Sequence, residues 1–509
     1  MTNPISRFAT VPITSPLPPC WLRKGPTRPD DDSNRSAIVW RVGPKTHFRQ
    51  ALVQTVENAK DVVLVASFLL ADETLAKTLI EAAQRGVRVY VLTASEARLS
   101  KVVSDEDAFD VRMVEEHKKL LDRLAEHVVL RTAEHFHAKF LVTDPATCPV
   151  GWISTANFNR ALEDSVELGV KLTEQAAVEL AGWFCNAFWL ESDRELIEKG
   201  RLAKVTAPPA QPKSPSSHSI RVTAKDHGEL RETTLQLIRN AQNRLVIVSY
   251  GVQDDHATTK AIEERAQAGV KITLLTRPRA AIAAAVKRLA TAGVTILAHD
   301  KLHAKAILSD QRGLVMTANL HTVGLDQGFE VGVLLDDNGT RELDDVLSQW
   351  IQTFPWCYAT AAPRDSHLGE LCLADLGLRT GRRMVQPEIV HPLPPVVADS
   401  VVTMEEAPTP KWVPVEEKET YFHKVRYKWQ VVPPRLPKEA KERLSPVVDA
   451  EKHDDGRSAK QGKGVTHGVP FDPPLYDHNE MVYVLLRPGD NLDRVRRVAA
   501  ELGGKVVVK

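Results

Sequence analysis

A short pattern of chemically active side chains occurs twice in the chain. The first copy runs from His137 to Asp144 and the second from His303 to Asp310, each with the spacing H-x-K-x4-D. Each copy is followed by Thr-Ala-Asn and then by a glutamate in a similar apolar run. One such motif can arise by chance, but two copies with matching sequels are hard to explain that way. The candidate site residues are His137, Lys139, Asp144, Thr155, Asn157 and Glu167 in the first copy and His303, Lys305, Asp310, Thr317, Asn319 and Glu330 in the second.

These residue types suit the transfer of a phosphoryl group. Side chains two apart in a strand point the same way, so the histidine and lysine of each copy are expected to point together. If the two copies pack about a pseudo-twofold axis, both pairs converge on one pocket. One neutral imidazole could then attack phosphorus while the other, protonated, donates to the leaving oxygen. The lysines and asparagines would hold the non-bridging oxygens.

The remaining residues of the set have supporting roles. Unperturbed histidine titrates at about pH 6.5, so small shifts can keep one ring neutral and the other charged. The two glutamates are candidates to orient the imidazoles, as a carboxylate does in a catalytic triad. The two threonines could add hydroxyl donors that bind the substrate. The two aspartates complete the catalytic motif, but their place further along it favours fixing the local turn or pairing with a lysine.

The composition sets few limits on function. The chain has 509 residues, 43% of them hydrophobic, which is ordinary for a globular protein. The 66 basic and 66 acidic residues cancel, a balance that hides any local basic groove. Five scattered cysteines without a C-x-x-C pair support neither a disulfide framework nor a zinc site, and favour a reducing cytoplasm. No signal peptide and no apolar run of about 18 residues is present, so we expect no transmembrane anchor.

Hydrophobic periodicity predicts alternating helices and strands. We expect strands over 36–42, 61–67 and 87–92 and helices over 47–58 and 73–84. This order favours an α/β layer fold. The segment from Asn58 to Val65 matches that from Asn240 to Ile247 in kind, so the repeat covers the whole unit and not only the motif.

The composition along the chain predicts six segments. These are a flexible N-terminal arm over 1–36, a first lobe over 37–202, a Pro/Ser linker over 203–219, a second lobe over 220–360, a Pro-rich connector over 361–411 and a small α+β domain of unknown role over 412–509. In the last segment, strands are expected over 425–431, 481–486 and 505–508 and a helix over 492–502.

The duplicated motif, with its asparagine and downstream glutamate, resembles the phospholipase D superfamily over about residues 37–360. The resemblance implies a duplicated α/β/α sandwich whose two lobes, related by a pseudo-twofold axis, share one active site. It also implies a covalent phosphohistidine intermediate, with no metal and no other cofactor. By the same resemblance, His137 would be the nucleophile and His303 the acid. The family's usual Gly-Ser before the asparagine is replaced here by Ser154-Thr155 and Met316-Thr317.

The resemblance leaves the substrate open. We expect a nuclease that cleaves DNA or RNA, acting with protein partners in a restriction or defence context. One alternative is a phospholipase D or cardiolipin synthase-like enzyme that acts on phospholipids. A second is a non-catalytic subunit that binds nucleic acid. A basic groove between the lobes would favour nucleic acid, whereas an apolar rim with exposed aromatic side chains would favour lipid.

Overall fold

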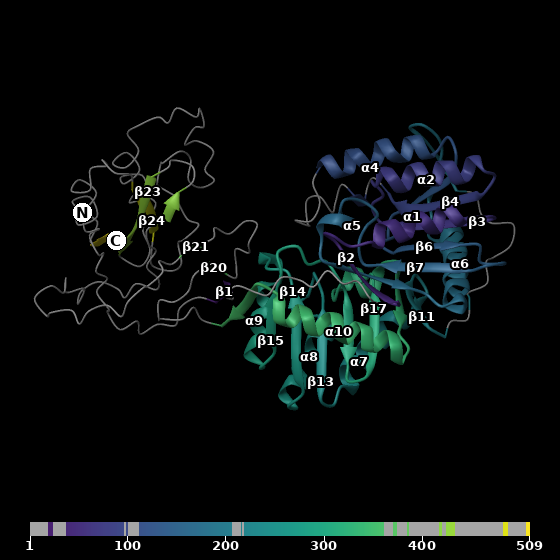
Figure 1. Cartoon of the computed structure of the whole chain (residues 1–509). Coiled ribbons are helices and arrows are strands. Elements are labelled where there is room, and N and C mark those ends of the chain that lie inside the picture. The colour runs from purple at the N-terminus through teal and green to yellow at the C-terminus, as the bar shows by residue number, and fades with distance from the viewer. Residues whose placement is uncertain are drawn as a thin grey trace, which may run out of the picture. The chain divides into compact units, whose positions relative to one another are not determined.

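The computed structural model divides into two compact units (Figure 1), of which residues 24–356 form one and residues 1–23 with 357–509 form the other. Both predicted lobes lie in the first unit. The described residues are 19–23, 37–95, 98–99, 111–205, 215 and 218–360, with the backbone of further strands between 370 and 508.

The first lobe is a mixed sheet with helices on both faces. Its strands are β2 (Val39–Val42), β3 (Val62–Ser67), β4 (Arg88–Ala94), β5 (Val129–Ala133), β6 (Lys139–Thr143), β7 (Val150–Ser154), β8 (Glu167–Lys171), β9 (Arg194–Glu198) and β10 (Arg201–Lys204). Its helices are α1 (Phe48–Asn58), α2 (Glu73–Gln84), α4 (Val111–Leu124), α5 (Ala161–Asp164) and α6 (Glu174–Leu190). The sheet order is β10-β9-β5-β4-β3-β6-β7-β8-β2, in which β3, β4 and β5 run parallel.

The second lobe repeats this arrangement. Its strands are β11 (Ile220–Ala224), β12 (His227–Gly228), β13 (Arg244–Val248), β14 (Lys271–Thr276), β15 (Thr295–Ala298), β16 (Ala306–Ser309), β17 (Arg312–Met316) and β18 (Glu330–Leu334). Its helical segments are α7 (Glu229–Asn240), α8 (Ala257–Gln267), η1 (Ala280–Ile282), α9 (Ala283–Thr291), the π-helix η2 (Val323–Gln327) and α10 (Asp337–Thr353). The order β11-β18-β17-β16-β13-β14-β15 matches β2-β8-β7-β6-β3-β4-β5 strand for strand. The predicted duplication and α/β fold class are therefore confirmed.

Alternation along the central strands explains the layers. Val63 and Val65 of β3 join the core formed with α1, α2 and α4. On the opposite face, Phe140 of β6 meets Phe184 of α6 with ring centroids 6.1 Å apart. Helix α2 ends before Gly86, whose φ of +91° is the left-handed conformation predicted for a glycine after a helix.

Two glutamates tie the lobes together in a crossed manner. Glu179 of α6, in the first lobe, accepts from the amides of Ser219 and Ile220 at the start of β11 (3.2 and 3.3 Å). Glu342 of α10, in the second lobe, accepts from three consecutive amides at the start of β2. Each long helix thus holds the first residues of the other lobe's edge strand.

The predicted N-terminal arm needs a correction. Within it, β1 (Cys20–Arg23) is a strand that pairs antiparallel with β20 (Glu370–Leu373), which lies in the predicted connector. Cys20 and Trp21 are buried, with 0% and 1% of their surface exposed. The short apolar run was hidden among prolines, and its partner lies far away in the sequence.

The other unit also contains the predicted strands of the last segment. They are β23 (Lys424–Val432), β24 (Val482–Leu486) and β25 (Lys505–Val508), with both β24 and β25 paired antiparallel to β23. The helix expected over 492–502 lies outside the described residues. Additional short strands are β19 (Trp356–Ala359), β21 (Met384–Val385) and β22 (Glu417–Glu419). Among the described residues, we find no helix with the length and apolar character needed to cross a membrane.

Candidate active site

The site begins with backbone hydrogen bonds that cross between the lobes. The amide of His137 donates to the carbonyl of Phe329 (3.0 Å), and the amide of Phe329 donates to the carbonyl of His135 (2.7 Å). The pattern recurs in the opposite direction: the amide of His303 donates to the carbonyl of Val166 (3.0 Å), and the amide of Val166 donates to the carbonyl of Lys301 (2.9 Å). These contacts place the first residue of β18 beside His137 and the first residue of β8 beside His303.

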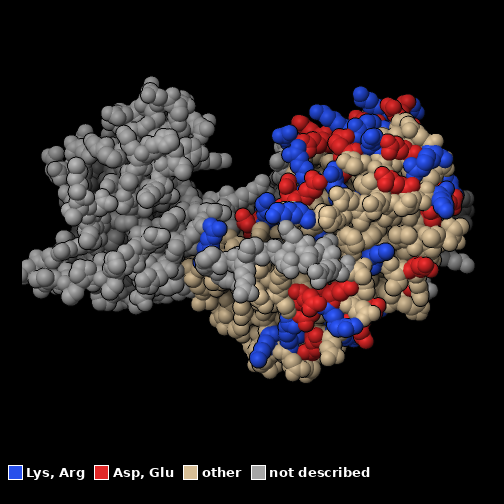
Figure 2. Space-filling model, in the orientation of Figure 1, with Lys and Arg blue, Asp and Glu red and all other residues tan. Residues whose placement is uncertain are grey.

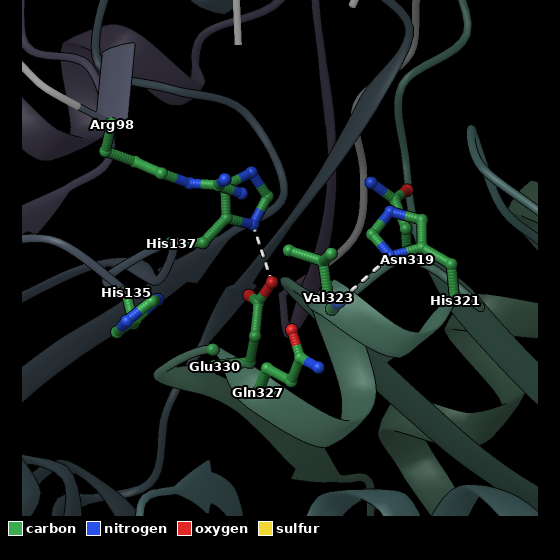
Figure 3. Close-up of a pocket in the computed structure, with 10 residues that line it drawn as sticks. Arg98, His135, His137, Asn319, His321, Val323, Gln327 and Glu330 are labelled. Atoms are coloured by element: carbon green, nitrogen blue, oxygen red, sulfur yellow. Dashed lines mark hydrogen bonds and ion pairs between the residues drawn. The ribbon is translucent and has the colours of Figure 1, made fainter. Parts of the chain in front are cut away.

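Each motif histidine is consequently paired with the glutamate of the other lobe, and Figure 3 shows the pair of His137 and Glu330. His137 Nδ1 lies 2.6 Å from Glu330 Oε1, and His303 Nδ1 lies 2.7 Å from Glu167 Oε1. The carboxylates accept from Nδ1–H, which leaves Nε2 of each ring as the atom that can attack or deliver a proton. Both glutamate side chains are 1% exposed or less. This geometry fits the role expected for the glutamates, which is to orient the imidazoles. The sequence did not predict that each glutamate would contact the histidine of the other lobe.

Burial sets the protonation of this pair of imidazoles. It lowers the pKa of His137 to about 3, against the opposing effect of Glu330 and with help from both motif lysines. Burial and Lys305 lower the pKa of His303 to about 4. Burial alone would raise the pKa of each glutamate. The partner histidine, a motif lysine and a threonine hydroxyl outweigh this effect of burial and keep the glutamate pKa below its ordinary value. Both rings are therefore neutral near pH 7 until an anion enters.

The motif lysines are fully buried beside the histidines. Lys139 and Lys305 are each 0% exposed, and each Nζ donates to the carbonyl oxygen of the histidine two residues before it. Each lysine also lowers the pKa of the other lobe's histidine, which shows that the two copies converge. The strands begin at Lys139 and Ala306, so both histidines precede their strands instead of lying within them.

The two asparagines are buried near this cluster in different ways. Asn319 is 2% exposed, lines the pocket beside His137, and its Oδ1 accepts from the Gly251 amide at 3.3 Å. Asn157 is 3% exposed, and within the described residues its Oδ1 has no hydrogen-bond partner. An unsatisfied buried oxygen of this kind is costly, which fits a group that meets substrate.

The threonines occupy a different place from the one expected. Thr155 donates to Glu167 Oε2 and Thr317 donates to Glu330 Oε2, each at 2.5 Å. Both hydroxyls are buried and also accept from the backbone amide after the glutamate. They were expected to offer hydroxyl donors to the substrate, but these donors are already engaged by the carboxylates. The structure therefore makes them positioning residues for the glutamates.

The motif aspartates lie at the far end of their strands. Asp144 accepts from the amides of Lys60, Asp61 and Val62, and Asp310 accepts from the three equivalent amides before β13. Their φ values of +46° and +50° are left-handed, a conformation that aspartate tolerates better than most residues. Of the two roles expected for them, the geometry matches the fixing of a turn.

The pocket beside His137 also contains residues that the sequence analysis did not single out. Arg98 from the first lobe and His321 from the second face it, together with His135 and Gln327 (Figure 3). His321 lies two residues after Asn319, a spacing that could have drawn attention to it. Aromatic rings also support both imidazoles: Phe68 lies 4.8 Å from His137 and Tyr250 lies 4.7 Å from His303, between ring centroids.

Solved structures with a similar fold share little sequence identity with this chain. Phosphatidylserine synthase from Haemophilus influenzae is 14% identical, over 68% of this chain and 90% of that one, with a TM-score of 0.47. Polyphosphate kinase from Porphyromonas gingivalis is 16% identical, over 61% and 49%, with a TM-score of 0.43. Nuc, a phospholipase D family member from Salmonella typhimurium, is 19% identical, over 27% and 97%, with a TM-score of 0.24.

No curated protein matches the chain. The family model described as "Cardiolipin synthase, PLD-like domain" matches residues 52–189 and 234–356, just over half of the chain and parts of both lobes. The matched segments contain every residue of the two motifs. The chain therefore belongs to the phospholipase D-like family and is an enzyme that acts on phosphodiesters.

Proposed function

We propose that the protein is a nuclease that cleaves DNA or RNA through a phosphohistidine intermediate without a metal ion. The observation that carries the phosphodiesterase part is the crossed pairing of His137 with Glu330 and His303 with Glu167. It presents two imidazoles, each oriented through Nδ1 by a carboxylate, between two buried lysines, and Lys305 Nζ also lies 3.3 Å from Nε2 of His303. Few other arrangements serve both the attack on phosphorus and the departure of an oxygen leaving group.

The two half-reactions follow from this geometry. Nε2 of neutral His137 attacks phosphorus, the bond to the leaving oxygen breaks, and protonated His303 gives its Nε2 proton to that oxygen. Neutral His303 then takes a proton from water, whose oxygen attacks phosphorus and breaks the bond to His137. The buried ammonium groups of Lys139 and Lys305 stabilise the charge on the non-bridging oxygens in both steps. The enzyme returns to its starting protonation state.

The surroundings of the pocket support nucleic acid as substrate. Among the described residues, the exposed large hydrophobic side chains include no aromatic residue, and Val323 is the member of that set that lines the pocket. The other lining residues include Arg98, His135, His321 and Gln327, which suit a polar, anionic ligand. Figure 2 shows basic and acidic side chains interspersed over the visible face.

A second candidate is an enzyme of phospholipid synthesis or hydrolysis. It is favoured by the matched family model, whose description names cardiolipin synthase. The same two half-reactions would serve it, with an alcohol in place of water as the acceptor of the phosphoryl group. The nuclease proposal also includes a protein partner and the cytoplasmic location that is expected from the scattered cysteines.

One comparison of substrates tests the proposal. The purified protein is offered single-stranded DNA, double-stranded DNA, RNA, and vesicles of phosphatidylcholine or phosphatidylglycerol, each with and without EDTA. The His137→Asn variant serves as the control for contaminating activity. We expect cleavage of nucleic acid that survives EDTA and is absent from the variant. Turnover of lipid that depends on His137, with intact nucleic acid, would establish the second candidate, and strict dependence on added Mg²⁺ would refute the metal-free mechanism.

A further inference from the structure

The segments that join the asparagine to the glutamate differ in length between the two halves of the site. The segment from Asn319 to Glu330 is one residue longer than that from Asn157 to Glu167. In the first lobe this segment contains the short helix α5, whereas in the second it contains the π-helix η2. A π-helix accommodates a single inserted residue in a helical turn, and such turns often occur at functional sites. The insertion therefore gives the second lobe a differently shaped wall.

This wall is packed closely against the catalytic asparagine. A Cβ added to Gly324 would lie 2.6 Å from the carbonyl oxygen of Asn319, so only glycine fits there. The Gly324 amide donates to Nδ1 of His321 at 2.9 Å, which places the proton of the neutral ring on Nε2. Burial lowers the pKa of His321 to about 4, and the ring therefore stays neutral near pH 7. His321 is thus a fixed N–H donor in the wall of the pocket.

The opposite wall contributes a positive charge. Arg98, from the first lobe, lines the same pocket, is partly buried, and extends toward His137 in Figure 3. Within the described part of the chain, no carboxylate lies within ion-pair distance of its guanidinium group. Gln327, on the π-helix, adds an amide to the pocket lining. A planar guanidinium group beside neutral N–H donors is well suited to bind a phosphate group.

The first lobe does not reproduce this arrangement. The residue equivalent to His321 is Asn159, whose Oδ1 accepts from the Ala161 amide at 2.8 Å and so is used within its own turn. Arg98, His321 and Gln327 therefore lie on the His137 side of the duplicated site, whereas on the His303 side Arg277 and Arg279 lie over the ring of Tyr250, which packs against His303. A substrate that extends from the scissile phosphate meets different chemistry in its two directions.

We propose that Arg98, His321 and Gln327 form a subsite beside His137 that binds a second phosphate group next to the scissile phosphodiester. The inference rests on the proposed phosphodiesterase function and makes it more specific. In a nucleic acid the second group is the neighbouring phosphate of the strand, and in a lipid it is the additional phosphate of a diphosphate headgroup. The subsite also makes the two sides of the duplicated site different for the substrate. It determines on which side of the cleaved bond the rest of the strand lies.

The test measures selectivity and not activity alone. The ratio of kcat/KM for a single-stranded oligonucleotide to kcat/KM for bis(4-nitrophenyl) phosphate is compared between wild type, Arg98→Gln and His321→Asn. Because a charge-assisted hydrogen bond is lost, we expect the ratio to fall about 10-fold or more in Arg98→Gln, and by a smaller factor in His321→Asn. Arg88→Gln, an exposed arginine paired with Asp61 in the same lobe, is the control and leaves the ratio unchanged. An unchanged ratio in Arg98→Gln overturns the subsite.

The outcome remains informative if the nuclease proposal fails. If wild type turns over lipid and not nucleic acid, vesicles that contain CDP-diacylglycerol are compared with vesicles that contain phosphatidylcholine. The preference for the diphosphate lipid is then expected to fall in Arg98→Gln, and its persistence overturns the proposal. If wild type turns over neither, binding of inorganic pyrophosphate by the folded protein is measured by calorimetry. Binding that is about 10-fold weaker in Arg98→Gln than in Arg88→Gln supports the subsite, and equal binding or none overturns it.

Discussion

The carboxylate of Glu330 in the second lobe lies 2.6 Å from Nδ1 of His137 in the first lobe. Its counterpart, Glu167, reaches His303 in the opposite direction at 2.7 Å. Each imidazole therefore depends on the other half of the chain for its tautomer and orientation. Correct docking of the lobes is thus a condition for chemistry at either histidine. The variants below are therefore chosen to separate effects on turnover from effects on folding.

Removal of the carboxylate charge should affect turnover much more than binding. In Glu330→Gln the amide can donate to Nδ1 and so favour the wrong tautomer of His137. We expect kcat to fall by about 10²- to 10⁴-fold, by analogy with the loss of a triad carboxylate, with little change in KM. Glu342→Gln removes a glutamate that also bridges the lobes but lies at β2, and it should retain near-normal kcat. A loss of similar size in both variants would mean that the effect comes from lobe docking.

The two histidines should act as one unit. His137→Asn and His303→Asn are each expected to abolish turnover, and the double variant should be little worse than either, because groups that act together are not additive. Rapid-quench labelling with a phosphodiester radiolabelled at phosphorus then identifies the nucleophile. A phosphoenzyme that accumulates in His303→Asn agrees with attack by His137, whereas accumulation only in His137→Asn reverses the assignment.

The motif aspartates should matter for stability more than for chemistry. Asp144→Ala leaves three backbone amides without their acceptor, and we expect a loss of about 3 kcal/mol in the free energy of unfolding. Asp144→Asn keeps one acceptor oxygen and the tolerance for positive φ, so its loss should be smaller. Urea denaturation measures both. A folded Asp144→Asn protein whose kcat is as low as that of His137→Asn would instead assign the carboxylate to catalysis.

As the pH is lowered, the protein should unfold at a higher pH than the titration of its surface carboxylates alone would predict. Folding lowers the histidine pKa values from 6.5 to about 3 and 4, so below about pH 6.5 the unfolded chain binds protons that the folded chain refuses. Stability is therefore full above pH 6.5 and falls as the pH drops towards the lowered values. The lowered pKa values of Glu167 and Glu330 act in the same direction at lower pH.

The melting temperature measures this effect. Between pH 7 and pH 5 we expect it to fall by on the order of 10 °C, from the two histidines together. In the variant that carries both His137→Asn and His303→Asn, most of this pH dependence should disappear. A wild-type melting temperature that is constant over this range would contradict the neutral state of the buried rings.

The pH dependence of turnover should shift when substrate binds. Catalysis needs one neutral and one protonated imidazole, and in the free enzyme this state is favoured only near the two lowered pKa values. A bound phosphate anion raises both values, because it stabilises the charged ring. The optimum of kcat/KM is therefore expected at lower pH than the optimum of kcat. An optimum of kcat/KM above pH 7 would be inconsistent with these pKa shifts.

Much of the fold could be predicted because it depends on local and repeated signals. The two lobes could be predicted from the apolar run of β3, from the glycine Gly86 that follows α2, and from the second copies of both features. The motif spacing also placed each lysine beside its histidine, but the contact common to both copies is from Nζ to the histidine carbonyl, because the histidines precede their strands. Strand β1 escaped prediction because its stability comes from a partner strand about 350 residues away, with no periodicity of its own.

The crossing of the glutamates could not be read from the sequence. Glu167 and Glu330 each follow the motif of their own lobe in a similar apolar run, and nothing local decides which histidine each will meet. The choice is made by the backbone bonds of Phe329 and Val166, which form only when the lobes dock. Thr155 and Thr317 instead contact the glutamate of their own lobe, across the pairing of β7 with β8 and of β17 with β18.

The crossed glutamates also have a consequence for the synthesis of the protein. The ribosome delivers His137 and the rest of the first lobe well before Glu330 has been added to the chain. In a nascent chain of that length the imidazole of His137 has no carboxylate from the second lobe to orient it, and the second motif histidine, His303, is absent altogether. The shared site is therefore incomplete in the emerging polypeptide until the last strand of the second lobe has left the exit tunnel and docked.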